Sequence, residues 1–137
     1  MSRGALTVVA VGGVLPASVI SSIAAAAIWL GGSASSAFAL DGLPEATVHR
    51  YHFVASEPEM AARIPCYCGC RGLAHRSLLD CFVRPGGGYE RHASGCGICG
   101  WEADDVERMA GEGMDAASIR TAIAGTYGSY GQPTDTQ

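Results

Sequence analysis

The chain contains no lysine, and its nine basic residues, all arginines, are outnumbered by thirteen acidic residues, which gives a formal net charge of −4. All of the acidic residues lie after residue 39, so the larger part of the chain is more acidic still. A domain of this charge offers no basic stripe for a phosphate backbone. Nucleic acid is therefore excluded as the expected partner.

Charge is also absent from Ala5 to Leu30, an apolar stretch preceded by Arg3. A positive residue followed by an apolar run is typical of a secretory signal peptide, and small residues at Ala37 and Ala39 fit the A-x-A cleavage pattern. We therefore expect cleavage before Leu40. The alternative is an uncleaved anchor, because the run reaches the length of about 20 residues that spans a bilayer. Residues 1–39 are predicted to be a signal peptide or an N-terminal membrane anchor, formed by a hydrophobic helix.

No cysteine precedes Cys66, so the chain offers no site for the acylation that attaches lipoproteins to membranes. Membrane contact is expected only if the N-terminal segment stays uncleaved. In either case the protein is predicted to be exported and extracytoplasmic: periplasmic, on the cell surface or secreted. All six cysteines fall between Cys66 and Cys99, a density that indicates a disulfide scaffold or a metal site.

The remainder of the chain divides into three predicted regions. Residues 40–63 form an N-terminal arm with one strand and a short helix around Glu59–Arg63. Residues 64–128 form the cysteine-rich domain, and residues 129–137 form a flexible tail. No internal repeat is visible.

Within the cysteine-rich domain, Gly and Cys punctuate the first half, which predicts loops with a short helix around His75–Phe82. A helix is predicted over Trp101–Gly111, and Asp115 is expected to cap a second one that ends at Gly125 or Gly128. The fold class is thus a small α-rich, cysteine-rich domain, in which irregular cysteine-bearing loops pack on a C-terminal helical hairpin.

Cys66, Cys68 and Cys70 alternate within the hexapeptide Pro-Cys-Tyr-Cys-Gly-Cys. In an extended or gently turning backbone, alternate residues project to one side, so we expect the three thiols to converge. A disulfide within Cys-x-Cys would be strained, whereas a soft metal accepts neighbouring sulfurs directly. Gly69 supplies the backbone freedom needed to curl around an ion.

The second cysteine motif is Cys96-Gly-Ile-Cys99, directly before the predicted Trp101 helix. Thiols at a helix N-terminus have a lowered pKa, so we expect these two to be thiolates near neutral pH. Cys81, His75 and His92 lie between the two motifs. The complete spacing indicates a soft-metal site, although it is not a standard zinc-finger spacing.

These motifs together resemble the bacterial PCYCGC-motif family of exported proteins, many of which are lipoproteins. The resemblance covers about residues 64–127 and implies a location and a domain, but no established activity. This chain differs in lacking the acylated cysteine. The resemblance rests on the hexapeptide, His75, Asp80-Cys81-Phe82, His92, Ser94-Gly95-Cys96-Gly97-Ile98-Cys99, Met109, Gly113 and Ile119-Arg120.

The leading hypothesis is a metal-binding module rather than an enzyme, with no catalytic residue assigned. Cu(I) comes first and Zn(II) second, because thiolate sites prefer these ions. The other partner expected is an exported metal or thiol protein. The predicted ligands are Cys66, Cys68, Cys70, Cys96 and Cys99, completed by Cys81, His75 or His92.

Two alternatives remain open. One is a thiol–disulfide exchange protein that uses Cys96 and Cys99, although the strand–helix alternation of thioredoxin-like proteins is missing. The other is a purely structural or binding domain held together by three disulfides. Several other residues are given ordinary structural roles: His49 and His52 as surface or hydrogen-bonded histidines, Tyr67, Trp101 and Met109 as packing residues, and Glu102–Glu107 as a solvated helix face.

Overall fold

The computed structural model describes residues 38–134. The described residues belong to one compact unit of the chain, Ser36–Gln137. The predicted N-terminal hydrophobic helix lies outside the described residues. Among the helices that are described, none has the length and apolar character needed to cross a membrane.

The region expected to be an arm begins with two helices, α2 (Glu45–Ser56) and α3 (Pro58–Arg63). The predicted strand is wrong. Val48, Tyr51 and Val54 recur at every third position and so lie on one side of a helix, and Tyr51 and Val54 are fully buried there. The short helix expected around Glu59–Arg63 is confirmed as α3, with Pro58 in its first turn, where a missing N–H costs nothing.

The loop region contains the short helix α4 (Leu78–Phe82) and two 3₁₀ turns, η2 (Cys70–Leu73) and η3 (His92–Gly95). Helix α4 is shorter than the predicted His75–Phe82. The Asp80 carboxylate accepts the Arg76 N–H at 2.7 Å, and the Leu78 N–H donates to the Ile64 carbonyl at 2.8 Å. These bonds hold residues 76 and 77 in a turn before the helix rather than in it.

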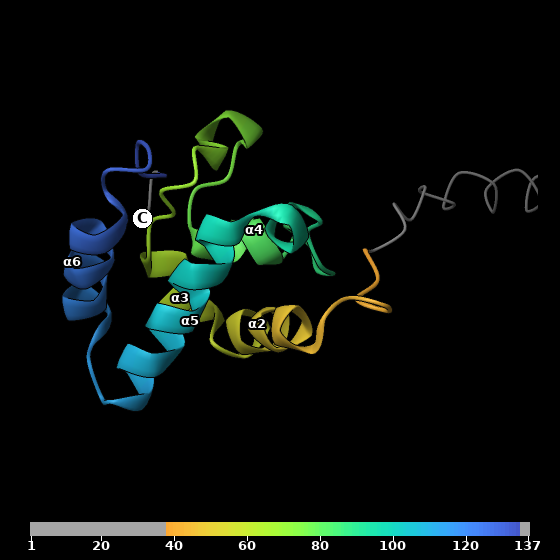
Figure 1. Ribbon diagram of the computed structural model, residues 1–137, viewed down its shortest axis with the longest axis horizontal. Coiled ribbons are helices and arrows are strands. Elements are labelled where there is room, and N and C mark those ends of the chain that lie inside the picture. The colour runs from red at the N-terminus through yellow and green to blue at the C-terminus, as the bar shows by residue number, and fades with distance from the viewer. Residues whose placement is uncertain (1–37, 135–137) are drawn as a thin grey trace, which may run out of the picture. The chain divides into compact units, whose positions relative to one another are not determined.

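The C-terminal hairpin consists of α5 (Gly97–Gly111) and α6 (Ala116–Tyr127). Helix α5 lies in the middle of the domain, with α6 packed on one side and α2 on the other (Figure 1). The expected cap of α6 is confirmed, since Asp115 Oδ1 accepts the Ser118 N–H at 2.8 Å. Helix α5 begins four residues before the predicted start, so the Cys96–Cys99 motif forms its first turn.

The core fills the space between these helices and the cysteine-bearing loops. Side chains from every α-helix contribute, and the largest fully buried apolar ones are Tyr51, Phe82, Ile64, Leu78, Ile119, Ile123, Val54 and Val106. Cys66, Cys81 and Cys99 are also completely buried in this core. The predicted class, a small α-rich domain with cysteine-bearing loops on a C-terminal helical hairpin, is confirmed.

After α6 the chain turns back toward the hexapeptide, and Thr134 is only 3% exposed. The Thr134 N–H donates to the Cys66 carbonyl at 3.0 Å, and its hydroxyl accepts the Cys66 N–H at 2.9 Å. As far as Thr134, the segment predicted to be a tail therefore packs against the first cysteine of the motif.

Candidate metal centre

The hexapeptide lies as a tight turn between α3 and η2. Gly69 adopts a left-handed conformation with φ of 82°, which uses the backbone freedom expected of it, because this region is costly for residues with a side chain. Cys66 and Cys70 are buried and Cys68 is half-buried. The turn directs Cys68 toward the N-terminus of α5, where Cys99 lies.

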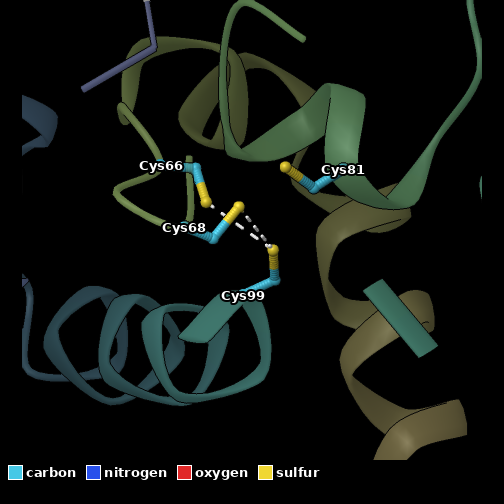
Figure 2. Close-up of side chains that lie close together, drawn as sticks. All are labelled: Cys66, Cys68, Cys81 and Cys99. Atoms are coloured by element: carbon cyan, nitrogen blue, oxygen red, sulfur yellow. Dashed lines mark hydrogen bonds between the residues drawn. The ribbon is translucent and has the colours of Figure 1, made fainter. Parts of the chain in front are cut away.

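Cys66, Cys68 and Cys99 bring their sulfurs together from two distant segments (Figure 2). The Sγ of Cys99 is 3.6 Å from that of Cys66 and 3.4 Å from that of Cys68. Cys81, from α4, completes a group of four whose sulfurs all lie within 4.8 Å of one another. The hexapeptide, α4 and α5 thus each contribute sulfurs to one group.

The spacing of these sulfurs fits a shared metal ion. All six cysteines are free thiols, and the contacts of 3.4 and 3.6 Å are far longer than the S–S bond of about 2.0 Å in a disulfide. Four thiolates at about 2.3 Å from a tetrahedral Zn(II) would be about 3.8 Å apart. The observed group therefore needs only small shifts to hold such an ion.

Cys70, Cys96 and His92 adjoin this group. His92 Nε2 lies 3.4 Å from the Cys68 sulfur, and the Cys70 and Cys81 sulfurs are 3.3 Å apart. Two further sets of possible ligands result, Cys68–Cys70–Cys81–His92 and Cys68–His92–Cys96–Cys99. All six predicted cysteines and His92 are thus brought together, with Cys68 common to every set.

His75 is the one predicted ligand that belongs to none of these sets. Its ring packs edge-to-face on His92 with 5.3 Å between centroids, and its buried Nδ1 has no hydrogen-bond partner among the described residues. Burial, together with the neighbouring His92, lowers the pKa of His75. His75 therefore packs against His92 as a ring whose charged form is disfavoured. His49, bonded to Glu107 at 2.9 Å, and His52, beside Tyr89, lie on α2 and have the structural roles predicted for them.

Hydrogen bonds within the cluster separate the pKa values of the thiols. Bonds from Cys66, Cys70, Cys81 and Cys99 stabilise the thiolate of Cys68 and lower its pKa strongly, against the opposing effect of burial. The bond to Cys68 is the largest contribution that raises the pKa of Cys66. In the absence of a metal, these contacts favour a negative charge on Cys68 over one on Cys66.

The Cys96–Cys99 motif does not have the lowered pKa values expected of a helix N-terminus. Cys96 caps α5, its sulfur accepting the Cys99 N–H at 3.5 Å, yet burial raises its pKa. For Cys99, the bond with Cys66 lowers the pKa, but the bond to Cys68 and burial outweigh it and raise the value to about 11. The lowered pKa values expected for these two thiols are therefore not found, because burial raises the pKa of Cys96, and the bond to Cys68 together with burial raises that of Cys99.

Glu102 is a residue of the site that sequence reasoning missed. It was predicted to lie on a solvated helix face, but it is fully buried beneath the hexapeptide, and its Oε1 accepts the Tyr67 N–H at 2.8 Å. Burial raises its pKa to about 7, opposed by Cys66 and by the Tyr67 bond. Its position three residues after Cys99, on the same side of α5, is the signal that could have revealed it.

Of the three large side chains predicted to be packing residues, two are buried and one is exposed. Tyr67 and Met109 are buried as expected, at 7% and 5% exposure. Trp101, however, is 52% exposed, so its prediction as a packing residue is wrong. Because Cys99 and Glu102 occupy the buried side of α5, Trp101 between them faces outward and covers Gly97.

Comparison with family models gives one match, described as a protein of unknown function with PCYCGC motif, over residues 32–137. The matched region contains the whole cysteine cluster together with α2 to α6. Comparison with curated proteins and with solved structures gives no significant match.

Proposed function

The chain belongs to the family of proteins of unknown function with the PCYCGC motif, and we propose that it binds a soft metal ion through its clustered cysteine thiolates. The observation that carries this proposal is the group of four sulfurs from Cys66, Cys68, Cys81 and Cys99. Soft thiolate ligands select Cu(I) and Zn(II) over magnesium, calcium or manganese. Cu(I) is proposed first and Zn(II) second.

The surroundings of the cluster suit binding rather than catalysis. Cys66, Cys81 and Cys99 are completely buried, which protects a bound ion from water, while Cys68 remains partly exposed and gives an incoming ion access. The Cys68 thiolate is the first ligand available, and further ligation releases the protons of the neighbouring thiols. Such a site suits the handling or delivery of a metal ion outside the cytoplasm.

Export is part of the proposal and is supported by the uncharged N-terminal stretch and by Ala37 and Ala39. A cell envelope or secreted location would give the protein contact with metal ions arriving from outside. The partners proposed are the metal ion and another exported protein that gives or receives it.

The geometry supports thiol–disulfide exchange less well. The sulfur of Cys99 lies close to the sulfurs of Cys66 and Cys68. The sulfur of Cys96 instead contacts the backbone N–H of Cys99. A redox-active Cys-x-x-Cys needs one thiol with a lowered pKa, and here burial raises that of Cys96.

Metal analysis combined with thiol counting tests the proposal. The full chain, purified anaerobically without chelators, is expected to carry soft metal in about stoichiometric amount and to have few disulfides. Three disulfides without affinity for Cu(I) or Zn(II) would instead establish the disulfide-stapled domain. Activity in an insulin-reduction assay that is lost in Cys99→Ser but kept in Cys68→Ser would establish the exchange protein.

A further inference from the structure

The cluster contains more donor atoms than one metal ion can use. Six sulfurs and His92 Nε2 form three overlapping sets, within each of which all donor atoms lie within 4.8 Å of one another. A tetrahedral Zn(II) takes four ligands, and a trigonal Cu(I) takes fewer. At least three donors beside any single ion would therefore be left without a role in binding.

The shortest contacts divide the donors into two lobes. In the first lobe, Cys99 lies 3.6 Å from Cys66 and 3.4 Å from Cys68. In the second, Cys70 lies 3.3 Å from Cys81, and both share a set with Cys68. Cys68 is the only cysteine common to all three sets, so it lies between the lobes.

We propose that the cluster binds two Cu(I) ions, one held by Cys66, Cys68 and Cys99 and the other by Cys68, Cys70 and Cys81, with the Cys68 thiolate bridging them. This inference rests on the proposed function and specifies its stoichiometry. A thiolate sulfur has several lone pairs and can bind two soft ions at once. His92 Nε2, 3.4 Å from the Cys68 sulfur, positions the bridge.

The same donors do not suit two Zn(II) ions that share Cys68 alone. Two such tetrahedral ions would use every donor, and after the set Cys66–Cys68–Cys81–Cys99 is filled, the second ion would need Cys70, Cys96 and His92. No set within the described part of the chain contains both Cys70 and Cys96, so their sulfurs are too far apart for this. Two ions joined by Cys68 alone therefore imply trigonal coordination, which Cu(I) accepts.

The role of Cys96 follows from this division. Its sulfur accepts the Cys99 N–H and thereby caps α5, and it belongs only to the third set. Serine is among the preferred N-cap residues, so Cys96→Ser keeps the cap and removes only the thiol. This variant is the matched control for the cysteines of the two lobes.

Native mass spectrometry of the full chain, loaded anaerobically with Cu(I) in the presence of bicinchoninate as competitor, tests the proposal. The wild-type chain is expected to bind two copper ions, and Cys96→Ser is also expected to bind two. Cys70→Ser and Cys66→Ser should each bind one, and Cys68→Ser no more than one. X-ray absorption should show copper–copper scattering in the wild-type protein and none in Cys70→Ser.

A wild-type chain that saturates with one copper ion would overturn the two-ion cluster and leave the proposed function intact. Two ions retained in Cys70→Ser would equally overturn the assignment of the second lobe. A wild-type chain that binds no copper and no zinc would overturn the proposed function itself. Because the wild-type count is decisive alone, the test does not depend on any variant folding.

Discussion

Glu102 connects the hexapeptide to α5 at the level of a single residue. Its carboxylate is fully buried and accepts the N–H of Tyr67, the residue between Cys66 and Cys68. This bond fixes the backbone from which both sulfurs project. Cys99 lies one turn earlier on the same side of α5, so Glu102 sets the distance between the two halves of the site.

Replacement of Glu102 should therefore reveal how much this bond contributes. Glu102→Ala leaves the buried Tyr67 N–H without an acceptor and is expected to lower the free energy of unfolding by about 2 kcal/mol. Glu102→Gln keeps a carbonyl oxygen in place to accept the N–H and should lose less stability. Urea denaturation of the reduced, metal-free chain measures both.

Glu107→Ala is the control on the same helix, because Glu107 bonds only to the exposed His49 among the contacts resolved for its side chain. It should change stability by no more than about 0.5 kcal/mol. If Glu102→Ala were as stable as Glu102→Gln, the hydrogen bond to Tyr67 would have no structural role.

The cysteine ligands of the site could be predicted from the sequence, but the buried residue that holds their backbone in place could not. The spacing of Cys66, Cys68 and Cys70 was enough to predict convergent thiols, because alternation is a local property of the backbone. The burial of Glu102 depends on a hexapeptide that lies 35 positions earlier in the chain. Only its spacing of three residues from Cys99 distinguishes it locally from Asp104, which is exposed and pairs with Arg50.

At the scale of elements, errors arose where tertiary contacts decided between local preferences. The α2 segment has β-branched and aromatic residues, which favour a strand, but its three-residue apolar spacing fits the core only as a helix. Helix α5 was predicted to begin at Trp101, which places acidic residues in its first turn. It begins at Gly97 instead, because the Cys96 cap and packing against α2 offset the cost of Gly97 and Gly100 in a helix.

The α6 cap was predictable from the sequence and yields a pH-dependent expectation. Asp115 accepts the Ser118 N–H, and this bond lowers the pKa of its carboxyl below the ordinary value of 3.8. Because the folded-state pKa is lowered, the Asp115 carboxylate stabilises the protein above pH 3.8. This stabilisation is lost as the pH falls through the folded-state pKa. Asp115→Ala should therefore lower the thermal midpoint at neutral pH.

Thermal melts from pH 7 to pH 2 check this expectation. The difference in thermal midpoint between the wild-type chain and Asp115→Ala should become smaller at acidic pH, because a protonated Asp115 no longer stabilises the helix through its charge. Asp115→Asn, which keeps the cap without the charge, is the control and should show no such trend relative to Ala. A gap that stays constant with pH would contradict a role for the carboxylate charge.

At the scale of the whole molecule, the N-terminal region gives a prediction about processing. The residues Ala37 and Ala39 suit a signal peptidase, so the exported protein is expected to begin at Leu40. Intact-mass analysis of the culture medium and of the membrane fraction measures the N-terminus. Ala39→Asp, which removes a small residue from the A-x-A pattern, should block cleavage. A membrane-bound chain that retains Met1–Ala39 would replace cleavage with an anchor.

The proposed metal site would also help to hold the domain together. The four sulfurs of Cys66, Cys68, Cys81 and Cys99 come from the hexapeptide, from α4 and from the first turn of α5, so a bound ion would connect three segments that are distant in sequence. When a site is formed only in the folded state, the free energy of metal binding becomes free energy of folding. At a free metal concentration about 100 times the dissociation constant, the gain is about 2.7 kcal/mol.

This linkage predicts how cysteine substitutions combine. Cys68→Ser should abolish most of the rise in thermal midpoint that Cu(I) produces, Cys99→Ser should abolish the share that comes from the ion it binds, and the double variant should be little worse than Cys68→Ser alone. The losses are not additive because both residues belong to one site. Cys96→Ser, which keeps the α5 cap, should retain the metal-dependent rise.

Circular dichroism is the suitable readout, since Trp101 is 52% exposed and its fluorescence would report poorly on unfolding. Additive losses with metal retained would show that Cys68 and Cys99 act independently, and the ion would then not join the hexapeptide to α5.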